Sequence, residues 1–272
     1  MTLRELAVAR RIAVEAGAIL REGAGRRHVS DQKRTAVDLV TEYDRRAEAH
    51  VVAELQKAFP DDAIVAEEGG GAAGGSGRRW LVDPLDGTTN FSHGLPFFCV
   101  SIAVEDADGS LAGVVEAPAL GWQFFAARGA GAFLVERARS SSAGDEGRRL
   151  AVSDTDALAS SLLATGFPYD TAASANNNLA EWSRIYPKTQ GLRRVGAAAL
   201  DLCFVAAGWM DGYWELKIKP WDVAAGALFV TEAGGRVTDY RGGAFRSDGG
   251  EILATNGRLH DALIAALAPP RT

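Results

Sequence analysis

The apolar residues near the start of the chain recur every three or four positions, which is the spacing of one face of an α-helix. The first such stretch covers residues 3–21. A second stretch follows Asp44 and ends at Pro60, because proline cannot continue a helix. Residues 63–66 form a short apolar run, which predicts a strand that leads into two adjacent acids.

Between residues 97 and 134 the pattern changes to short β-rich apolar stretches separated by glycine-containing turns, which is typical of an antiparallel sheet. Residues 138–147 are polar and charged and predict a surface loop. Helices and strands alternate after this loop. The expected elements are a strand at 161–165, helices near 178–186 and at 196–207, a strand at 212–216, a helix at 222–233, and then a further strand and helix.

The helix expected at residues 222–233 is apolar around most of its circumference, which predicts that it is buried on all sides. Gly234 and Gly235 follow it and are suited to ending a helix. These elements predict a protein of the α/β (α+β) class. We expect two halves, residues 1–150 and 151–272, that fold as one compact unit.

Residues 69–77 consist of Gly, Ala and Ser, without a side chain that could anchor them. This composition predicts a flexible loop. The loop is either disordered or a lid over a site.

The composition narrows the class of protein. The chain has 272 residues, of which 47% are hydrophobic and 24% charged, as in an ordinary globular protein. A net charge of −6 disfavours nucleic acid as a partner, because nucleic-acid binding needs a basic surface. The sequence has no apolar run long enough to cross a membrane and no signal-peptide core, so we expect a cytoplasmic protein.

The cysteines and histidines indicate which metal chemistry is available. Cys99 and Cys203 each lie in an apolar run, which is typical of reduced cysteines in a core. Four scattered histidines and the absence of a C-x-x-C motif give zinc no support. A hard cation with oxygen ligands suits the acidic composition better.

The most informative segment is residues 80–91, which read W-L-V-D-P-L-D-G-T-T-N-F. An apolar run predicts a buried strand that stops at Asp83, and a turn from Asp83 to Asp86 would bring two carboxylates together. Gly87 relieves the backbone, and Thr88 can open a helix whose free N–H groups attract anions. This combination suits a metal-bridged phosphate site, although ordinary turn aspartates would give the same pattern.

Three acids outside this segment could complete such a site. Glu67 and Glu68 end a strand, and adjacent strand residues face opposite sides. We therefore expect Glu67 to face the Asp83 and Asp86 pair, with Glu68 next to it; the alternative is that both glutamates are solvated. Asp222 stands at the mouth of a buried helix, where one carboxylate can both cap the helix and bind a cation.

Asp44 lies three residues after Thr41, as an acid does in the first turn of a capped helix. Its functional interpretation is that of a hydrogen-bond acceptor. Together with the Thr88 hydroxyl it would orient an attacking water.

These segments together resemble the inositol monophosphatase family of metal-dependent, lithium-sensitive phosphatases. The resemblance extends from about residue 5 to about residue 265. It is carried by residues 38–44, 66–68, 80–91, 221–226 and 231–235. The resemblance implies a layered α-β-α-β-α sandwich of the inositol monophosphatase and fructose-bisphosphatase type, a homodimer, and two or three Mg²⁺ ions in each site.

The resemblance also implies which residues hold the metal. Glu67, Asp83 and the backbone carbonyl of Leu85 would hold one Mg²⁺. Asp83, Asp86 and Asp222 would hold a second, and Glu67 would reach a weaker third through water. Most metal ligands therefore come from the first half of the chain.

The remaining implied roles concern catalysis and the substrate. Asp44 and Thr88 match the pair that activates the attacking water, with Glu67 as a further catalytic group. The Gly87 and Thr88 amides would meet the phosphate next to Asp86 and Asp222. The positions that contact the hydroxyl-bearing ring of the substrate are Gly196, Ala197, Ala198 and Glu215.

The implied function is an Mg²⁺-dependent inositol-1-monophosphatase in which water attacks phosphorus directly and no covalent phosphoenzyme forms. Alternative substrates of the same fold are fructose 1,6-bisphosphate, histidinol phosphate and adenosine bisphosphate, but residues 88–91 resemble the inositol branch. A non-catalytic binding or regulatory protein is the other alternative. Ala197, where some relatives have threonine, leaves the ring preference open, and the roles of Lys33, Arg193 and Arg194 stay open too.

Overall fold

The computed structural model describes residues 4–28, 31–32, 39–137 and 146–268. Lys33, Asp38 and most of the polar loop predicted at 138–147 lie outside the described residues.

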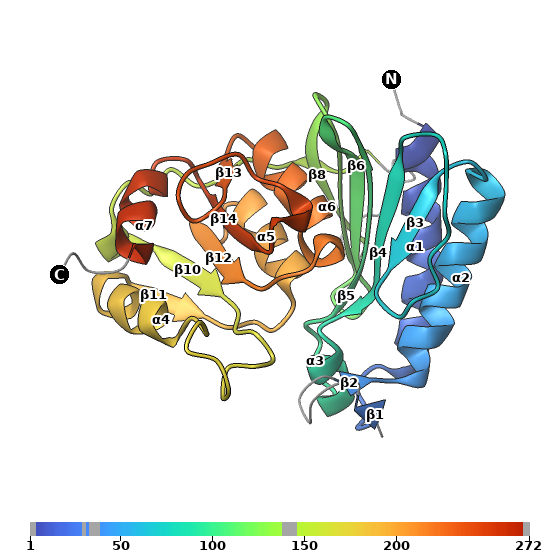
Figure 1. Ribbon diagram of the computed structural model, residues 1–272, viewed down its shortest axis with the longest axis horizontal. Coiled ribbons are helices and arrows are strands. Elements are labelled where there is room, and N and C mark those ends of the chain that lie inside the picture. Colours follow the sequence, from blue (N-terminus) through green and yellow to red (C-terminus); the bar gives the residue numbers. More distant parts are fainter. Residues whose placement is uncertain (1–3, 29–30, 33–38, 138–145, 269–272) are drawn as a thin grey trace.

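The described chain folds into five layers in the order α-β-α-β-α, as predicted (Figure 1). Helices α1 and α2 cover the outer face of the first sheet, α5 and α6 lie between the two sheets, and α4 and α7 cover the far face of the second sheet. The helices are α1 (Arg4–Gly23), α2 (Glu42–Ala58), α3 (Thr88–His93), α4 (Leu179–Ile185), α5 (Ala198–Ala206), α6 (Pro220–Glu232) and α7 (His260–Leu267), with 3₁₀ turns at Leu158–Ser160, Tyr186–Lys188 and Ser247–Gly249.

The first sheet runs in chain order from β3 to β9, with β3 and β4 parallel and the other neighbours antiparallel. The antiparallel part covers the segment that the sequence predicts. The strands are β3 (Ala63–Ala66), β4 (Arg79–Asp86), β5 (Cys99–Asp106), β6 (Gly109–Ala117), β7 (Trp122–Ala127), β8 (Gly131–Glu136) and β9 (Arg148–Arg149), and a separate small hairpin pairs β1 (Asp31–Gln32) with β2 (Leu39–Val40).

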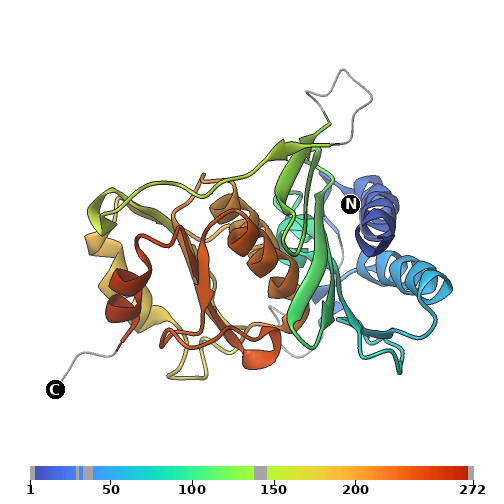
Figure 2. The same ribbon diagram turned by 90° about the horizontal axis from the view of Figure 1, so that it is seen from above.

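The second sheet has the order β11-β10-β12-β14-β13. β10 is parallel to both of its neighbours, whereas β14 is antiparallel to β12 and β13. The strands are β10 (Leu162–Thr165), β11 (Gly191–Arg193), β12 (Gly212–Leu216), β13 (Arg236–Thr238) and β14 (Glu251–Thr255). Helices α5 and α6 lie next to this sheet and separate it from the first sheet (Figure 2).

Side chains of β4 alternate between two cores. Trp80 and Val82 pack with α1 and α2, while Leu81 packs with α5 and α6. Because both faces of the strand are covered, it reads as an unbroken apolar run rather than an alternating one. This double burial holds the end of β4 firmly between the helix layers.

Among the described residues, no helix combines the length and the apolar character that crossing a membrane requires.

The Gly-rich segment at 69–77 differs from its prediction. The sequence predicts a flexible loop without anchors, but Ala72 exchanges two backbone hydrogen bonds with Ile64 of β3, at 2.8 and 2.9 Å. The Ser76 hydroxyl also donates to Asp62 at 2.6 Å. The prediction is wrong because backbone groups supply most of the anchoring, and these groups leave no trace in the residue types.

Candidate metal and phosphate site

The sequence predicts that the strand stops at Asp83. In the structure β4 continues to Asp86. Its pairing register with β5 shifts between these two aspartates. Such a shift marks a bulge in the strand rather than a chain-reversing turn. Asp83 Oδ1 accepts the N–H of Leu85 at 2.9 Å, so one of the site carboxylates itself stabilises the irregular backbone.

Gly87 connects this strand end to the short helix α3. Its φ of +90° is a left-handed conformation, and a Cβ atom here would lie 2.8 Å from the Phe97 carbonyl oxygen. Both facts favour glycine. α3 then begins at Thr88, as predicted.

Asp44 and Thr88 lie together although 44 residues separate them in the sequence. The Thr88 hydroxyl lies 3.1 Å from Asp44 Oδ1 and 3.0 Å from the Leu85 carbonyl oxygen. The other oxygen of Asp44 accepts the N–H of Thr41 at 2.8 Å and its hydroxyl at 2.5 Å, which caps α2 as the sequence predicts. Asp44 is fully buried, so this capping arrangement fixes its orientation toward Thr88.

Glu67 and Glu68 face different sides of the chain. The backbone N–H of Glu67 donates to the Val82 carbonyl of β4 at 3.2 Å, and its side chain lines the same cavity as Asp83. Glu68 instead lies against the α2 surface. The structure therefore places the predicted member of the pair, Glu67, toward the aspartates.

Asp222 comes from the second half of the chain. α6 begins at Pro220, two residues before the predicted start, because proline suits the first helical position. Asp222 is thus not the capping residue but the third residue of the helix, and its Oδ2 accepts the Lys219 N–H at 3.0 Å. Its carboxylate still serves both the helix start and the cavity.

Asp86 is held by the start of another helix. Its two carboxylate oxygens accept the N–H groups of Ala198 at 3.2 Å and Ala199 at 2.7 Å, at the N-terminus of α5. Free N–H groups at a helix start favour a negative charge. Ala199 was not among the predicted site residues, because a backbone donor can be of any residue type.

One cavity of about 160 Å³ between the two sheets collects these residues. Its lining contains Glu67, Asp83, Leu85, Asp86, Gly87, Thr88, Gly196, Ala197, Ala198, Glu215 and Asp222. Asp44 reaches this group through Thr88. The structure thus brings every predicted site residue to one place, while the roles predicted for them remain proposals.

The carboxylates of this cavity repel one another. Burial raises the pKa of Asp83 well above its ordinary range, and the nearby carboxylates of Glu67 and Asp86 raise it further. Burial also raises the pKa of Asp222. For Asp86 burial raises the pKa to about 6 although the Ala199 and Ala198 amides oppose this change. Negative charge is therefore costly here without a cation.

The donor set fits a hard divalent cation. No three Asp, Glu, His or Cys side chains in the described ranges already form a metal-ligand group. However, Glu67, Asp83, Asp86, Asp222 and the Leu85 carbonyl offer only oxygen atoms, and these atoms line one cavity.

The opposite end of the cavity has a different character. Tyr213 donates its hydroxyl to the Glu215 carboxylate, and burial raises the pKa of Glu215 to about 7 against the effect of Tyr213 and Arg194. Asp201 is also buried there, and its Oδ1 has no hydrogen-bond partner. Sequence reasoning missed Asp201 and left Arg194 open. Arg194 lines the cavity, whereas Arg193 belongs to β11 and is exposed.

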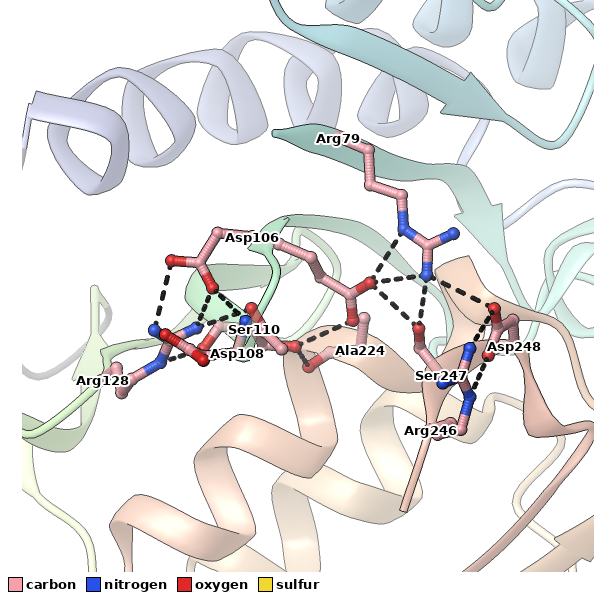
Figure 3. Close-up of polar contacts among 11 residues, drawn as sticks. Arg79, Asp106, Asp108, Ser110, Arg128, Ala224, Arg246, Ser247 and Asp248 are labelled. Carbon is pink, nitrogen blue, oxygen red and sulfur yellow. Dashed lines mark hydrogen bonds and ion pairs between the residues drawn. The ribbon is translucent and has the colours of Figure 1, made fainter. Parts of the chain in front are cut away.

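A second cavity, of about 490 Å³, lies near the other end of α6, and three of the acids that line it pair with arginines (Figure 3). We call it the paired-charge groove. Arg79 contacts Glu105 at 2.9 Å, Arg128 contacts Asp106 at 2.8 Å, and Arg246 contacts Asp248 at 3.1 Å. Each of these three acids has an arginine partner.

Comparisons with known proteins show the family of this chain. A model of the inositol monophosphatase family matches residues 3–270. The chain is 42% identical to the protein named Nus factor SuhB of Pseudomonas aeruginosa, over 97% of this chain and 96% of that protein. It is 43% identical to the inositol-1-monophosphatase of a Synechocystis species, over 97% and 88% of the two chains.

Solved structures show the same relationship. The inositol monophosphatase from Anabaena superposes with a TM-score of 0.84 at 41% identity, with 97% of this chain and 96% of that chain covered. The extragenic suppressor protein suhB from Bartonella henselae superposes with a TM-score of 0.86 at 39% identity, with 99% and 100% covered. The fold, the order of the acidic segments and these matches lead to one conclusion: the chain belongs to the inositol monophosphatase family of phosphatases.

Proposed function

We propose that this protein is an Mg²⁺-dependent phosphomonoester hydrolase and that inositol 1-phosphate is its substrate. The observation that carries the proposal is the cavity that four acids and a backbone carbonyl group line together next to the Asp44–Thr88 pair. Burying like charges without cations is unfavourable. A site that binds cations and phosphate explains the arrangement.

We assign Glu67, Asp83, Asp86, Asp222 and the Leu85 carbonyl to the cation. When bound, Mg²⁺ supplies a positive field that neutralises charge on the phosphoryl group and on the leaving oxygen and favours ionisation of a water. Two or three ions per site, as the family resemblance implies, would also convert a repulsive cavity into one that attracts a phosphate ester.

Asp44 and Thr88 orient the attacking water in this proposal. The Thr88 hydroxyl can donate its proton to only one acceptor at a time, and both Asp44 and the Leu85 carbonyl are within reach. The lone pairs of the hydroxyl are thereby directed away from these two acceptors. They can accept a hydrogen bond from a water, and this bond aligns the water for attack on phosphorus.

The substrate's ring is assigned to the end of the cavity with Glu215, Gly196 and Ala197. Carboxyl oxygens bind hydroxyl groups well, whereas Ala197 provides only a methyl group. The combination suits a polyol that presents several hydroxyls. It suits a nucleotide base less well.

Phosphate release tests the proposal. We expect the protein to release inorganic phosphate from inositol 1-phosphate in Mg²⁺, and to lose this activity when the metal is chelated or when millimolar Li⁺ is added. A panel of fructose, histidinol and adenosine phosphates identifies the preferred ester. Absence of phosphate release from every ester would overturn the proposal.

The route of attack has its own test. Hydrolysis of a P-chiral phosphate ester in isotopically labelled water should invert the configuration at phosphorus, because water displaces the leaving oxygen in one step. Retention of configuration would reveal a covalent phosphoenzyme and contradict direct attack.

A second candidate function is a regulatory one. It is favoured by the relative named Nus factor SuhB, which matches almost the whole chain at 42% identity. The same site residues would then serve binding rather than turnover. An Asp83→Asn variant that lacks phosphatase activity separates the two: full biological function in that variant would favour the regulatory role.

We further propose a homodimer and a cytoplasmic location, as the family resemblance implies. Large apolar side chains remain exposed on the single chain and could be covered in a dimer. They include Leu95, Phe97, Tyr169, Leu179, Tyr186 and Trp209. Sedimentation of the purified protein tests the dimer, since a monomer at micromolar concentration would contradict it.

A further inference from the structure

The Gly-rich segment at 69–77 lies along β3, directly after the site residue Glu67. Besides the pairing of Ala72 with Ile64, the N–H groups of Gly75 and Ser76 donate to the Asp61 carbonyl at 2.9 and 3.0 Å. The segment is thus fastened at its middle and near its end. A lid that opens over the cavity would have to break all of these bonds.

Two glycines explain how the segment can lie so close to the strand. A Cβ atom on Gly71 would lie 2.5 Å from the Ile64 carbonyl oxygen, and one on Gly74 would lie 2.2 Å from the Ala63 nitrogen. Both distances are too short for carbon. These glycines are therefore required by close packing, not by a need for flexibility.

The start of the segment is fastened by Glu48 of α2. Its carboxylate accepts the N–H of Glu68 at 2.6 Å and that of Gly70 at 2.8 Å. Glu48 is only 4% exposed, although it is acidic. Hydrogen bonds from N–H groups to a carboxylate are among the stronger ones in proteins. Two strong hydrogen bonds thus hold the backbone at Glu68 and Gly70, shortly after Glu67.

Glu67 is held on both sides as a result. On one side its own N–H donates to Val82 of β4. On the other side the Glu68 N–H is fixed by Glu48. The turn between Ala66 and Gly69 is closed only by a long bond of 3.4 Å, so the shorter bonds to Glu48 contribute more to its order.

Glu48 also lies one helical turn after Asp44, on the same face of α2. Asp44 contacts Thr88, and Glu48 contacts the chain after Glu67. One rigid helix face therefore sets the relative position of two parts of the cavity wall.

We propose that Glu48 is a positioning residue for cation binding: by fixing the backbone after Glu67, it holds the Glu67 carboxylate toward the cavity that it lines with Asp83. The segment at 69–77 is then a scaffold and not a lid. The inference rests on the proposed function in that Glu67 is taken as a cation ligand.

The test compares Glu48→Gln with Glu54→Gln in the full-length protein. Glu54 lies on the same helix but pairs with Arg11 at 2.9 Å, away from the cavity. Mg²⁺ binding is measured by calorimetry without substrate. We expect Glu48→Gln to weaken Mg²⁺ binding about tenfold, the scale found when the partners of metal ligands are removed, and Glu54→Gln to leave it unchanged.

Two further readouts distinguish positioning from mere support of the fold. Hydrogen exchange at the Glu68 and Gly70 amides should accelerate in Glu48→Gln. At saturating Mg²⁺ kcat should recover, because a filled site restores the position of Glu67. Unchanged Mg²⁺ affinity together with faster exchange would overturn the proposal and leave Glu48 with a structural role alone.

Two further variants keep this test decisive. If Glu48→Gln fails to fold, Glu48→Asp keeps the charge but shortens the reach, and it should weaken Mg²⁺ binding less; unchanged binding in that folded variant would also overturn the proposal. Glu67→Gln tests the assignment of Glu67 as a cation ligand, on which the proposal depends. If Glu67→Gln leaves Mg²⁺ binding unchanged while Glu48→Gln weakens it, the ligand assignment of Glu67 fails and Glu48 acts through another group.

Discussion

The two ends of helix α6 treat acidic side chains in opposite ways. At its start, Asp222 shares a buried cavity with Asp83 and Asp86, and burial and neighbouring carboxylates raise the pKa of each aspartate. Near its other end, in the paired-charge groove, Glu105 and Asp106 each meet an arginine (Figure 3). One chain thus contains both acids that are paired with arginines and acids whose neighbours are mainly other carboxylates.

This difference identifies the site more firmly than the acids alone. Glu105 and Glu116 are buried and pair with Arg79 and Arg137. The electrostatic neighbours of Asp83, Asp86 and Asp222 among the described residues are instead mainly carboxylates. Such an imbalance lowers stability and is typical of functional sites. The missing positive charge is what a divalent cation would bring.

The largest expected effect is on turnover. Asp83→Asn should lower phosphate release by about 10³-fold, because it removes a proposed ligand of the cation that would stabilise the developing negative charge. The metal-free variant should be at least as stable as the parent, since it carries one buried negative charge fewer. Phosphate release and thermal unfolding measure the two effects.

The matched change in the paired-charge groove is Asp106→Asn. It should leave turnover unchanged, because this aspartate contacts Arg128 and the Asp108 N–H and does not line the catalytic cavity. Full activity of Asp83→Asn, or an equal loss in Asp106→Asn, would break the comparison between the two regions.

The second effect concerns metal and pH. Burial raises the pKa of Asp86 from 3.8 to about 6, so the folded protein binds more protons than the unfolded chain between these values. The free energy of unfolding of the metal-free protein should therefore fall as pH rises through this window, and the raised pKa values of Asp83 and Asp222 should extend the fall upward.

Added Mg²⁺ should reverse this loss. At a hundred times its Kd, a ligand stabilises the folded state by about 2.7 kcal/mol. The gain in Tm should be larger near pH 8 than near pH 5, because protons compete with Mg²⁺ for the carboxylates. Thermal unfolding with Mg²⁺ and with chelator at both pH values measures it, and a gain independent of pH would contradict the assignment.

The third effect should appear in stability alone. Glu105→Gln removes a buried carboxylate that accepts hydrogen bonds from Arg79, Ser110 and Ser247. We expect a loss of about 2 kcal/mol in the free energy of unfolding, since the buried Ser247 hydroxyl loses a charged acceptor while the partly exposed Arg79 regains water. Denaturant unfolding measures the loss. A large drop in kcat would show that the groove affects the active site.

The smallest effect is expected at Asp201, whose pKa is raised by burial and by the charge of Glu215. The folded state thus favours the protonated form, and its stability falls as pH rises above the ordinary value for aspartate. Asp201→Asn should raise the free energy of unfolding by about 1 kcal/mol near pH 8, and less near pH 5. A loss at both pH values would instead reveal a favourable contact of the charged group.

The acidic segments could be found from the sequence because a cation site needs particular side chains. Asp83, Asp86 and Asp222 can be recognised by their residue type and by their positions at the ends of apolar runs. The family resemblance then gave the order of the layers. The buried helix α6 was also predictable, since its residues are apolar on all sides.

Other features could not be read from residue types. The N–H groups of Ala198 and Ala199 bind Asp86 through the backbone, so their side chains carry no signal. Proline at position 84 suggested a turn, but pairing with β5 kept the strand extended as far as Asp86. Glycines in the segment at 69–77 fit both a flexible and a tightly packed loop, and only the distances to β3 distinguish the two.

The bond between Asp86 and helix α5 has a consequence for any attempt to divide the polypeptide. A fragment ending at residue 150 would retain Asp83 and Asp86 but lose the amides of Ala198 and Ala199, and the complementary fragment would keep Asp222 and Glu215 without their counterparts. Neither piece alone could hydrolyse an ester. Restored hydrolysis on mixing would therefore report that the two pieces had reassociated, which makes the enzyme a candidate for a split reporter.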